Sequence, residues 1–251
     1  MALLAPGDGV RSVPPAAPAA AEPAPPGQPA EPAPPAGVPE STTYTTIDAA
    51  PADTAAGPTD GSVVHPRQEV VVATAPGGEP FARIGPEQIG QTWLPVIAEQ
   101  PGWVQVLLPS RPNGSTGWLP ENALERAVSP YQIRVHLGSM RLELLSEDEL
   151  VGEWTIGIGK DSAPTPTGRT FLLGSFSDEA QDYSPVILPL GSHSPTLDTF
   201  GGGPGTVAIH TWPTDDVFGT ASSEGCIRVP PEALDQLTEV PLGTLVLIDE
   251  Q

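Results

Sequence analysis

A cysteine and a histidine near the end of the sequence have the chemistry of a nucleophile and a base. Cys226 is the only cysteine among 251 residues and lies in the run Ser223-Glu224-Gly225-Cys226-Ile227-Arg228. His210 ends an apolar segment upstream of that run. A thiolate is the reactive form of cysteine, and a neighbouring imidazole produces it by accepting the thiol proton. The pair indicates nucleophilic acyl transfer, whereas composition alone would favour a buried, unreactive thiol.

The residues around Cys226 suit this chemistry in different ways. Gly225 lets the backbone approach a substrate closely, and consecutive N–H groups at Gly225 and Cys226 predict an oxyanion hole. Arg228 carries a permanent charge that either holds a substrate carboxylate or braces the loop. Glu224 would raise the pKa of the thiol if its carboxylate pointed inward. Glu224 would also attract a cationic amine of the substrate. Both charged residues are therefore candidate substrate-binding residues.

The segments that must position these residues read as short strands. Alternation of apolar and polar residues predicts β structure, and Pro and Gly interrupt it at turns. We expect a hairpin turning near Gly138-Ser139 and a helix at 230–237 that begins with prolines. The expected strands of this region are 131–137, 142–144, 154–158, 171–173, 186–188, 206–210 and 244–248. The domain prediction is a mainly β catalytic domain over 128–251 with one short helix.

Two further segments precede that domain. Residues 63–127 show short strands separated by turns, including the Asn113-Gly114 hairpin signal, and predict a small β-barrel. Residues 1–62 are rich in Pro and Ala at first, then in Thr, Ala and Asp, with few side chains to bury. Such a composition predicts a disordered spacer.

The charge balance excludes some partners. Asp and Glu outnumber Lys and Arg by 31 to 10, which argues against binding to nucleic acid or to anionic membranes. A single cysteine excludes zinc sites that need paired cysteines, so we expect no metal and no cofactor. No run of 18 apolar residues spans a membrane, and no export signal is apparent at the start. We expect the sequence to begin after a removed export signal and to act outside the cytoplasm.

Several motifs in one order resemble the L,D-transpeptidase catalytic domain family. In chain order, the motifs are Gly157-Ile158-Gly159-Lys160, Thr165-Pro166-Thr167-Gly168-Arg169, Ile209-His210, Ser223-Glu224-Gly225-Cys226-Ile227-Arg228 and Val240-Pro241-Leu242-Gly243-Thr244-Leu245-Val246. The resemblance covers roughly 131–249. The segment 63–127 resembles the bacterial SH3-like modules that precede catalytic domains in cell-wall enzymes. Thr211 departs from the family, which commonly has Gly after the histidine.

The resemblance implies a β-sandwich or barrel-like catalytic fold and a specific reaction. Cys226 would attack a peptidoglycan stem peptide, release terminal D-alanine and pass the acyl group to a side-chain amine of a second stem. His210 would be the base, and the Thr211 carbonyl would orient its imidazole. Ser223 would shape the loop. From its Gly/Ser/Pro loop, His193 is a further candidate for the substrate cleft.

The resemblance also implies peptidoglycan stem peptides as partners, carbapenem-type inhibitors as ligands and a monomeric chain. Two alternatives stay open at this point. An L,D-carboxypeptidase would give the same thioester to water, and a non-catalytic wall-binding module would carry a relic site.

Overall fold

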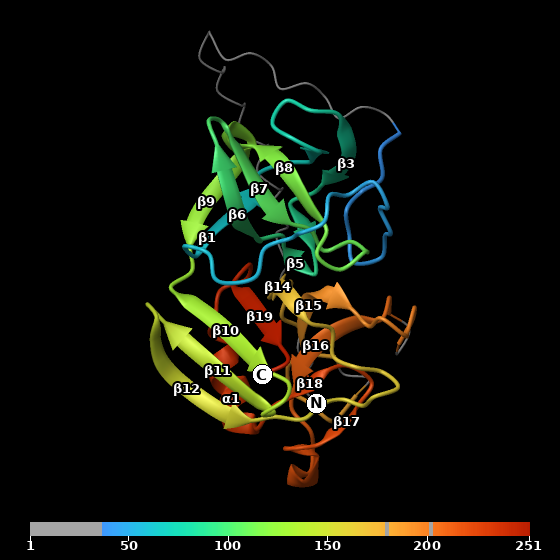
Figure 1. Cartoon of the computed structure of the whole chain (residues 1–251), viewed down its shortest axis with the longest axis vertical. Helices are drawn as coiled ribbons and strands as arrows, with labels where there is room; N and C mark the ends of the chain where they lie inside the picture. The colour runs from blue at the N-terminus through green and yellow to red at the C-terminus, as the bar shows by residue number, and fades with distance from the viewer. Residues whose placement is uncertain (1–36, 179–180, 201–202) are drawn as a thin grey trace, which may run out of the picture. The chain divides into compact units, whose positions relative to one another are not determined.

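The described residues form β-sheets with one seven-residue α-helix among them (Figure 1). The computed structural model describes residues 37–178, 181–200 and 203–251. The predicted mainly β fold with one short helix is confirmed for these residues. The first 36 residues of the predicted spacer, and Gly201 and Gly202 of the glycine-rich loop, lie outside them.

A seven-stranded sheet occupies the segment predicted as a small β module. Its strand order is β3-β2-β8-β7-β6-β1-β9, and every pairing in it is antiparallel. Its strands are β1 (Ser62–Pro66), β2 (Val70–Ala73), β3 (Pro80–Ile84), β6 (Leu94–Gln100), β7 (Trp103–Leu107), β8 (Thr116–Pro120) and β9 (Leu124–Val128). A small pair, β4 (Glu87–Gln88) and β5 (Gly90–Gln91), and a 3-10 turn, η1 (Glu121–Ala123), complete the segment. The likeness to SH3-like modules stays a prediction.

The segment before this sheet is packed rather than loose, which corrects part of the spacer prediction. We call residues 37–61 the N-terminal strap. The Ser41 amide donates to the carbonyl of Arg83 at 2.7 Å, and the Ile47 amide donates to that of Arg111 at 2.8 Å. The Ile47 side chain is buried in the core of the module. Backbone hydrogen bonds and one well-placed apolar side chain therefore order a segment whose composition suggested disorder.

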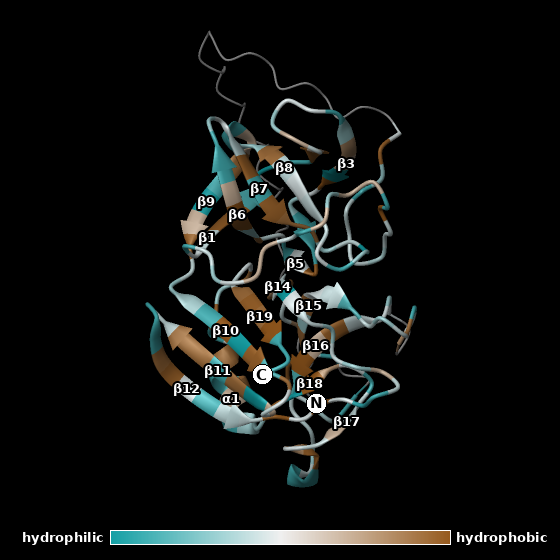
Figure 2. Cartoon of the chain, viewed as in Figure 1, coloured by the Kyte–Doolittle hydropathy of each residue, from teal (hydrophilic) through white to brown (hydrophobic). Residues whose placement is uncertain are grey.

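A five-stranded sheet begins the second half of the described chain. Its order is β12-β11-β10-β19-β14, with β10 and β19 parallel and the other pairs antiparallel. Its strands are β10 (Tyr131–His136), β11 (Arg141–Ser146), β12 (Glu149–Thr155), β14 (Gly168–Phe171) and β19 (Leu245–Asp249). The turn between β10 and β11 contains Gly138-Ser139, as the sequence predicts. Figure 2 shows the hydrophobic colouring on β19 and β16, which face the core.

A three-stranded sheet lies beside it with the order β15-β16-β18. Its strands are β15 (Leu188–His193), β16 (Thr206–His210) and β18 (Ile227–Arg228). The remaining elements are β13 (Ile158–Gly159), β17 (Ala221–Ser223), η2 (Asp215–Val217) and α1 (Pro231–Leu237). Helix α1 begins with proline and buries Ala233, Leu234 and Leu237. It thereby closes the core formed by both sheets.

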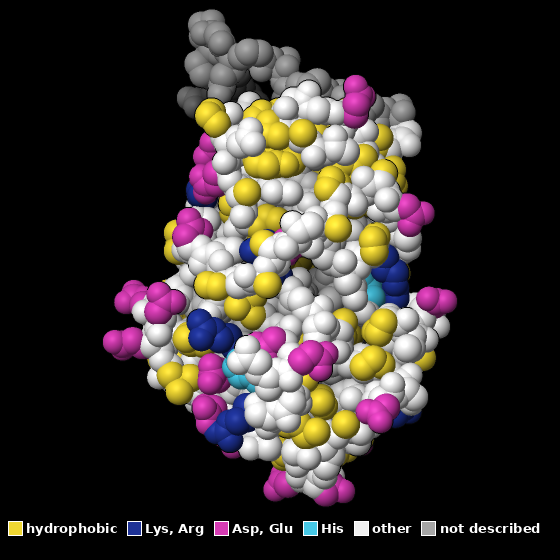
Figure 3. Space-filling model, viewed as in Figure 1, with side chains coloured by type: hydrophobic (Ala, Val, Ile, Leu, Met, Phe, Trp, Pro, Cys, Tyr) yellow, Lys and Arg dark blue, Asp and Glu magenta, His cyan; other side chains and the backbone are white. Residues whose placement is uncertain are grey.

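The two halves of the described chain share packing. Phe171, Leu173 and Leu245 come from beyond residue 128 but belong to the core of the preceding module. Arg169 of β14 forms a buried ion pair with Asp53 of the strap, with two N–O distances of 2.7 Å. On the face seen in Figure 3, acidic side chains are dispersed rather than gathered in one patch.

Candidate active site

Strand β16 ends at His210, and Cys226 directly precedes β18 of the same three-stranded sheet. The two strands are parallel, with Ile209 opposite Ile227 and His210 opposite Arg228. Side chains alternate between faces along a strand. Ile209 and Ile227 are fully buried in the core, so His210 and Arg228 project from the other face. The residue that the sequence predicts as nucleophile thus directly precedes a strand that pairs with the strand ending in the predicted base.

The imidazole of His210 is held by the carbonyl that the family resemblance implies. His210 Nδ1 lies 2.7 Å from the Thr211 carbonyl oxygen. A carbonyl only accepts, so Nδ1 carries the proton and Nε2 is left as an acceptor. Burial lowers the pKa of His210 to about 4, and the nearby Arg228 charge adds to this effect, against the hydrogen bond to Thr211, which raises it. The ring is therefore neutral at pH 7 and able to take a proton.

The Cys226 thiol is half-buried. Burial raises its pKa, while a backbone hydrogen bond with Ala208 and the charge of Arg228 act to lower it. Ala208 precedes His210 by two positions on β16, so the sulfur lies beside the strand that carries the histidine. A neutral imidazole and a thiol of raised pKa are the starting states that general-base catalysis requires.

The loop that carries Cys226 is fixed by its own hydrogen bonds. Ser223 Oγ donates to the Cys226 carbonyl at 2.6 Å and accepts from the Gly225 amide at 3.1 Å. Gly225 has a φ of +112°, a conformation that favours glycine. Ser223 thus shapes the loop as expected. The expectation for Gly225 is not met, because the amide predicted to face an oxyanion is engaged with Ser223.

Thr165 ties this loop to the segment after β13, a role that the sequence did not assign. Its hydroxyl donates to the Gly225 carbonyl at 2.9 Å and accepts from the Gly159 amide at 2.9 Å. Thr165 begins the Thr-Pro-Thr-Gly segment that carries part of the family resemblance. In the sequence, the Thr-Pro-Thr-Gly motif marks the position of Thr165 but does not reveal its hydrogen bond to Gly225.

The charge of Glu224 is matched by a neighbour. Lys160 at the end of β13 forms an ion pair with Glu224, and both side chains are about 40% exposed. The largest cause of the raised pKa of Cys226 is burial, and the charge that acts on the thiol is that of Arg228. The inward-pointing carboxylate considered from the sequence is therefore not what raises the pKa of the thiol.

Two aromatic side chains, Tyr183 and Trp212, lie close to the imidazole of His210. The Arg228 guanidinium lies 3.9 Å from the centre of the Trp212 ring, and its Nη1 donates to Ser222 Oγ at 3.2 Å. The Tyr183 ring centre lies 4.9 Å from that of His210 and 5.4 Å from that of Trp212. Burial and then Cys226 raise the pKa of Tyr183. Trp212 follows the histidine closely in sequence, but nothing in the sequence connects Tyr183 with the site.

His193 is not part of the substrate cleft, which corrects the sequence prediction. Its side chain is buried, and Nε2 lies 2.7 Å from the Thr43 carbonyl and 3.0 Å from Thr43 Oγ1. The backbone of His193 exchanges two hydrogen bonds with the Asn113 amide, at 2.8 and 2.7 Å. The residue therefore joins β15 to the strap and to the β7–β8 loop.

Other kinds of site find little support in the part of the chain that the structure describes. Within residues 37–178, 181–200 and 203–251, no group of His, Cys, Asp and Glu side chains could hold a metal ion. No helix among these residues has the length and apolar character needed to cross a membrane. What the structure does contain is a half-buried cysteine in a loop fixed by hydrogen bonds and a neutral imidazole on the neighbouring strand, and these are the groups that cysteine acyl transfer uses.

Known proteins resemble the segment of this chain that carries His210 and Cys226. Residues 130–248 match the family model YkuD, the L,D-transpeptidase catalytic domain. The YkuD protein of Bacillus subtilis (strain 168) is 26% identical over 121 residues, and that of Bacillus licheniformis is 28% identical over 120 residues. These matches cover 48% and 47% of this chain and 66% of each relative. The family model and the relatives support assignment of this segment to the L,D-transpeptidase catalytic domain family.

Solved structures with detectable likeness carry the same description. The catalytic domain of an L,D-transpeptidase from E. faecium is 22% identical, with a TM-score of 0.38, covering 49% of this chain and 98% of that one. An L,D-transpeptidase from Mycobacterium tuberculosis H37Rv is 14% identical, with a TM-score of 0.42, covering 62% and 93%. L,D-transpeptidase 3 from Mycobacterium tuberculosis, in complex with a faropenem-derived adduct, is 13% identical, with a TM-score of 0.42, covering 62% and 93%.

Proposed function

We propose that this protein is an L,D-transpeptidase that cross-links peptidoglycan stem peptides through a thioester on Cys226. The observation that carries the proposal is the hydrogen bond from His210 Nδ1 to the Thr211 carbonyl. It leaves Nε2 as the basic atom, on a strand that pairs with β18, which Cys226 directly precedes. An acyl-transfer site needs this combination of a nucleophile and an oriented base.

In the first half of the reaction, Cys226 Sγ attacks the amide carbonyl after the third residue of a stem peptide. His210 Nε2 takes the thiol proton as the sulfur–carbon bond forms. The tetrahedral intermediate collapses when the carbon–nitrogen bond breaks. The proton passes from His210 to the leaving nitrogen, and terminal D-alanine departs. The product is a thioester between the stem peptide and Cys226.

In the second half, the side-chain amine of another stem attacks the thioester carbonyl. His210 accepts a proton from that amine and returns it to the departing sulfur, which restores the thiol. The new amide joins two third-position residues, a 3–3 cross-link. Since the substrate lies in the cell wall, we propose that the protein acts on the outer side of the cytoplasmic membrane.

The flanking residues take supporting roles in this proposal. Ser223 and Thr165 hold the Cys226 loop through the hydrogen bonds described above. Arg228 holds its charge near the thiol while stacked on Trp212. Glu224 would meet an acceptor amine only after exchanging its contact with Lys160. These residues position the reacting groups and the substrate rather than exchange protons.

The first experiment tests the nucleophile. Intact-protein mass spectrometry after incubation with a carbapenem should find one added inhibitor mass on the wild type, located at Cys226. The Cys226→Ala variant should keep its native mass and a similar melting temperature. The occurrence of a faropenem-derived adduct on L,D-transpeptidase 3 from Mycobacterium tuberculosis motivates this class of probe. An unmodified wild type would argue against an activated thiol.

The second experiment tests the acceptor. After incubation with disaccharide-tetrapeptide, chromatographic analysis should find dimers that lack one D-alanine. Tripeptide monomers alone would instead identify an L,D-carboxypeptidase that gives the thioester to water. Unchanged substrate with a folded protein would identify a non-catalytic wall-binding module. The Cys226→Ala variant is the control for contaminating activity in each case.

A further inference from the structure

The peptide group between His210 and Thr211 is bound at both of its polar ends. The His210 carbonyl accepts a hydrogen bond from the Val229 amide at 2.9 Å, and the Thr211 amide donates to Ser184 Oγ at 3.1 Å. Because a peptide group is planar, two bonds at opposite edges fix its orientation. The carbonyl that binds the imidazole belongs to the next peptide group along the chain, which therefore follows a fixed plane.

Ser184 is suited to accept at this position because its single hydroxyl proton is used elsewhere. Its hydroxyl donates to the Val186 carbonyl at 2.6 Å, which leaves the lone pairs of the oxygen for the Thr211 amide. The side chain of Gln181 binds both ends of the Ser184 backbone, at 3.0 Å to the amide and at 2.7 Å to the carbonyl. The residue is buried. The acceptor is therefore held in place by its own segment of the chain.

The residue before Ser184 contacts the imidazole itself. The Tyr183 ring lies against that of His210, with 4.9 Å between the ring centres, and it also reaches Trp212. Trp212 is bound in turn by the Arg228 guanidinium, 3.9 Å from the centre of its ring. The peptide group that orients the base is therefore flanked by one residue with a bound amide and one residue with a bound side chain.

We propose that Ser184 is a positioning residue, whose hydroxyl fixes the backbone of Thr211 and so keeps the Thr211 carbonyl directed at His210 Nδ1. The inference rests on the proposed function, because the orientation of the imidazole matters for the reaction only if His210 is the base. Without the hydroxyl, the buried Thr211 amide loses its partner, and the backbone turns to regain one. The carbonyl then binds Nδ1–H less firmly, and Nε2 carries the proton in part of the molecules. Those molecules lack the basic atom that accepts the thiol proton.

The direct test is the tautomer of His210, measured at pH 7 by proton–nitrogen NMR of the full chain with isotope-labelled histidine. The His210→Gln variant identifies the signals of this residue among those of the four histidines. The wild type should carry the proton on Nδ1, and Ser184→Ala should give a mixture in which Nε2 is partly protonated. Ser177→Ala is the matched control and should resemble the wild type, because Ser177 Oγ donates to the Pro185 carbonyl at 2.8 Å, away from the base.

The rate of acylation by a carbapenem measures the consequence for the reaction. Ser184→Ala should acylate Cys226 about five- to tenfold more slowly than the wild type, the loss expected for one hydrogen bond. Ser177→Ala should keep the rate of the wild type. If Ser184→Ala does not fold, Ser184→Gly removes the same hydroxyl and takes its place in both measurements.

The tautomer separates a positioning role from a merely structural one. An unchanged tautomer of His210 in Ser184→Ala would overturn the proposal, even in a variant that is slower or less stable than the wild type. A tautomer change that Ser177→Ala shows equally, or an acylation rate equal to that of the wild type, would also overturn it. If the wild type itself took up no carbapenem, the proposed function would fail, and the tautomer comparison would still decide whether Ser184 positions His210.

Discussion

Two buried histidines on neighbouring strands have similar surroundings and different attachments. His193 ends β15 and His210 ends β16, strands that pair antiparallel. Burial is the first cause that lowers the pKa of each to about 4. His193 uses Nε2 to bind Thr43, a residue far away in the sequence. His210 uses Nδ1 to bind the carbonyl of the next residue.

The difference shows that burial and a low pKa do not by themselves identify a catalytic base. His193 Nε2, the nitrogen at the tip of the ring, binds Thr43 of the strap, so the residue links β15 to the strap. His210 is bound through Nδ1 to a backbone carbonyl, which leaves Nε2, the nitrogen at the tip of the ring, available. Which nitrogen is occupied, and by what, separates the two roles.

Substituting each histidine separately should give the largest contrast. His210→Gln should slow carbapenem acylation by about 10²–10⁴-fold, because a positioned base contributes that much. His193→Gln should leave the rate within a fewfold of wild type and lower the melting temperature, because its contact with Thr43 is lost. Stopped-flow acylation and thermal melts measure the two effects. Similar rate losses for both variants would contradict the division of roles.

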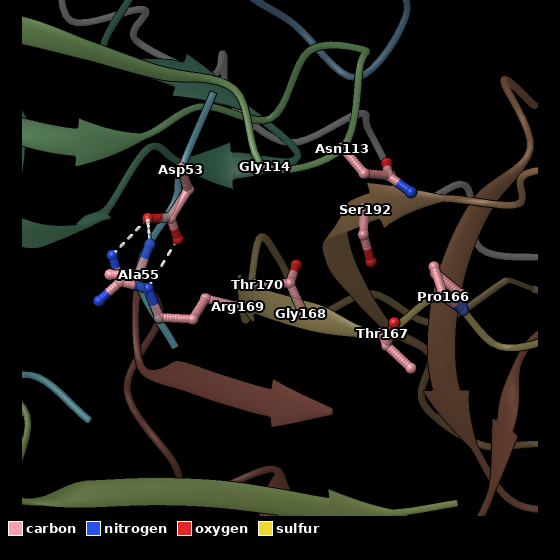
Figure 4. A pocket seen from close by; sticks show the side chains of 10 residues that line it. All are labelled: Asp53, Ala55, Asn113, Gly114, Pro166, Thr167, Gly168, Arg169, Thr170 and Ser192. Carbon is pink, nitrogen blue, oxygen red and sulfur yellow. Dashed lines mark hydrogen bonds and ion pairs between the residues drawn. The ribbon is translucent and has the colours of Figure 1, made fainter. Parts of the chain in front are cut away.

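Breaking the buried ion pair between Asp53 of the strap and Arg169 of β14 (Figure 4) should lower the stability of the fold strongly. Asp53→Asn leaves the buried Arg169 without its counter-charge, which should lower the free energy of unfolding by about 3–5 kcal/mol. Urea denaturation followed by tryptophan fluorescence measures this loss. The control is Asp161→Asn at an exposed position, where a change within about 0.5 kcal/mol is expected. Equal midpoints for the two variants would mean that the Asp53–Arg169 ion pair adds nothing to stability.

Stability should also fall with acid between pH 6.5 and about 4. Both histidines stay neutral in the folded state down to about pH 4 but are protonated in the unfolded state below pH 6.5. Folding therefore loses free energy as pH falls through this window, by about 3 kcal/mol for each histidine. Denaturation at a series of pH values should find roughly half this dependence in His193→Gln. An unchanged dependence would rule out a contribution from His193.

The exposed ion pair beside the thiol should matter least. Lys160→Met removes the partner of Glu224, and such exposed pairs contribute about 0–1 kcal/mol. We expect a similarly small change in stability and less than about a fivefold change in the rate of Cys226 alkylation by iodoacetamide. Glu224→Gln is the matched control. A larger loss in Lys160→Met than in Glu224→Gln would mean that an unpaired Glu224 acts on the thiol.

Local sequence patterns predict much of the fold and part of the site. Strands such as β10 and β16 and the helix at Pro231–Leu237 follow from alternation, turns and capping, which depend on adjacent residues. Motif order predicts His210 and Cys226 as a pair, and the parallel register of β16 and β18 puts them at neighbouring strands.

The features that were missed depend on contacts between distant residues. The strap has the composition of a loose segment, but Arg83 and Arg111 supply backbone partners that local composition cannot reveal. His193 and Tyr183 lie in segments without clear periodicity, and their positions follow from how those segments fold back. Local preference is a weak guide wherever tertiary contacts decide the conformation.

The strap has a consequence for the order of folding. Its bond between Thr43 and His193 joins residues 150 positions apart, and its ion pair with Arg169 spans 116 positions. Contacts at such separation require closure of a long loop, whose entropic cost slows folding. We therefore expect the strap to dock after both sheets have formed. The earliest part of the described chain would then be the latest to find its place.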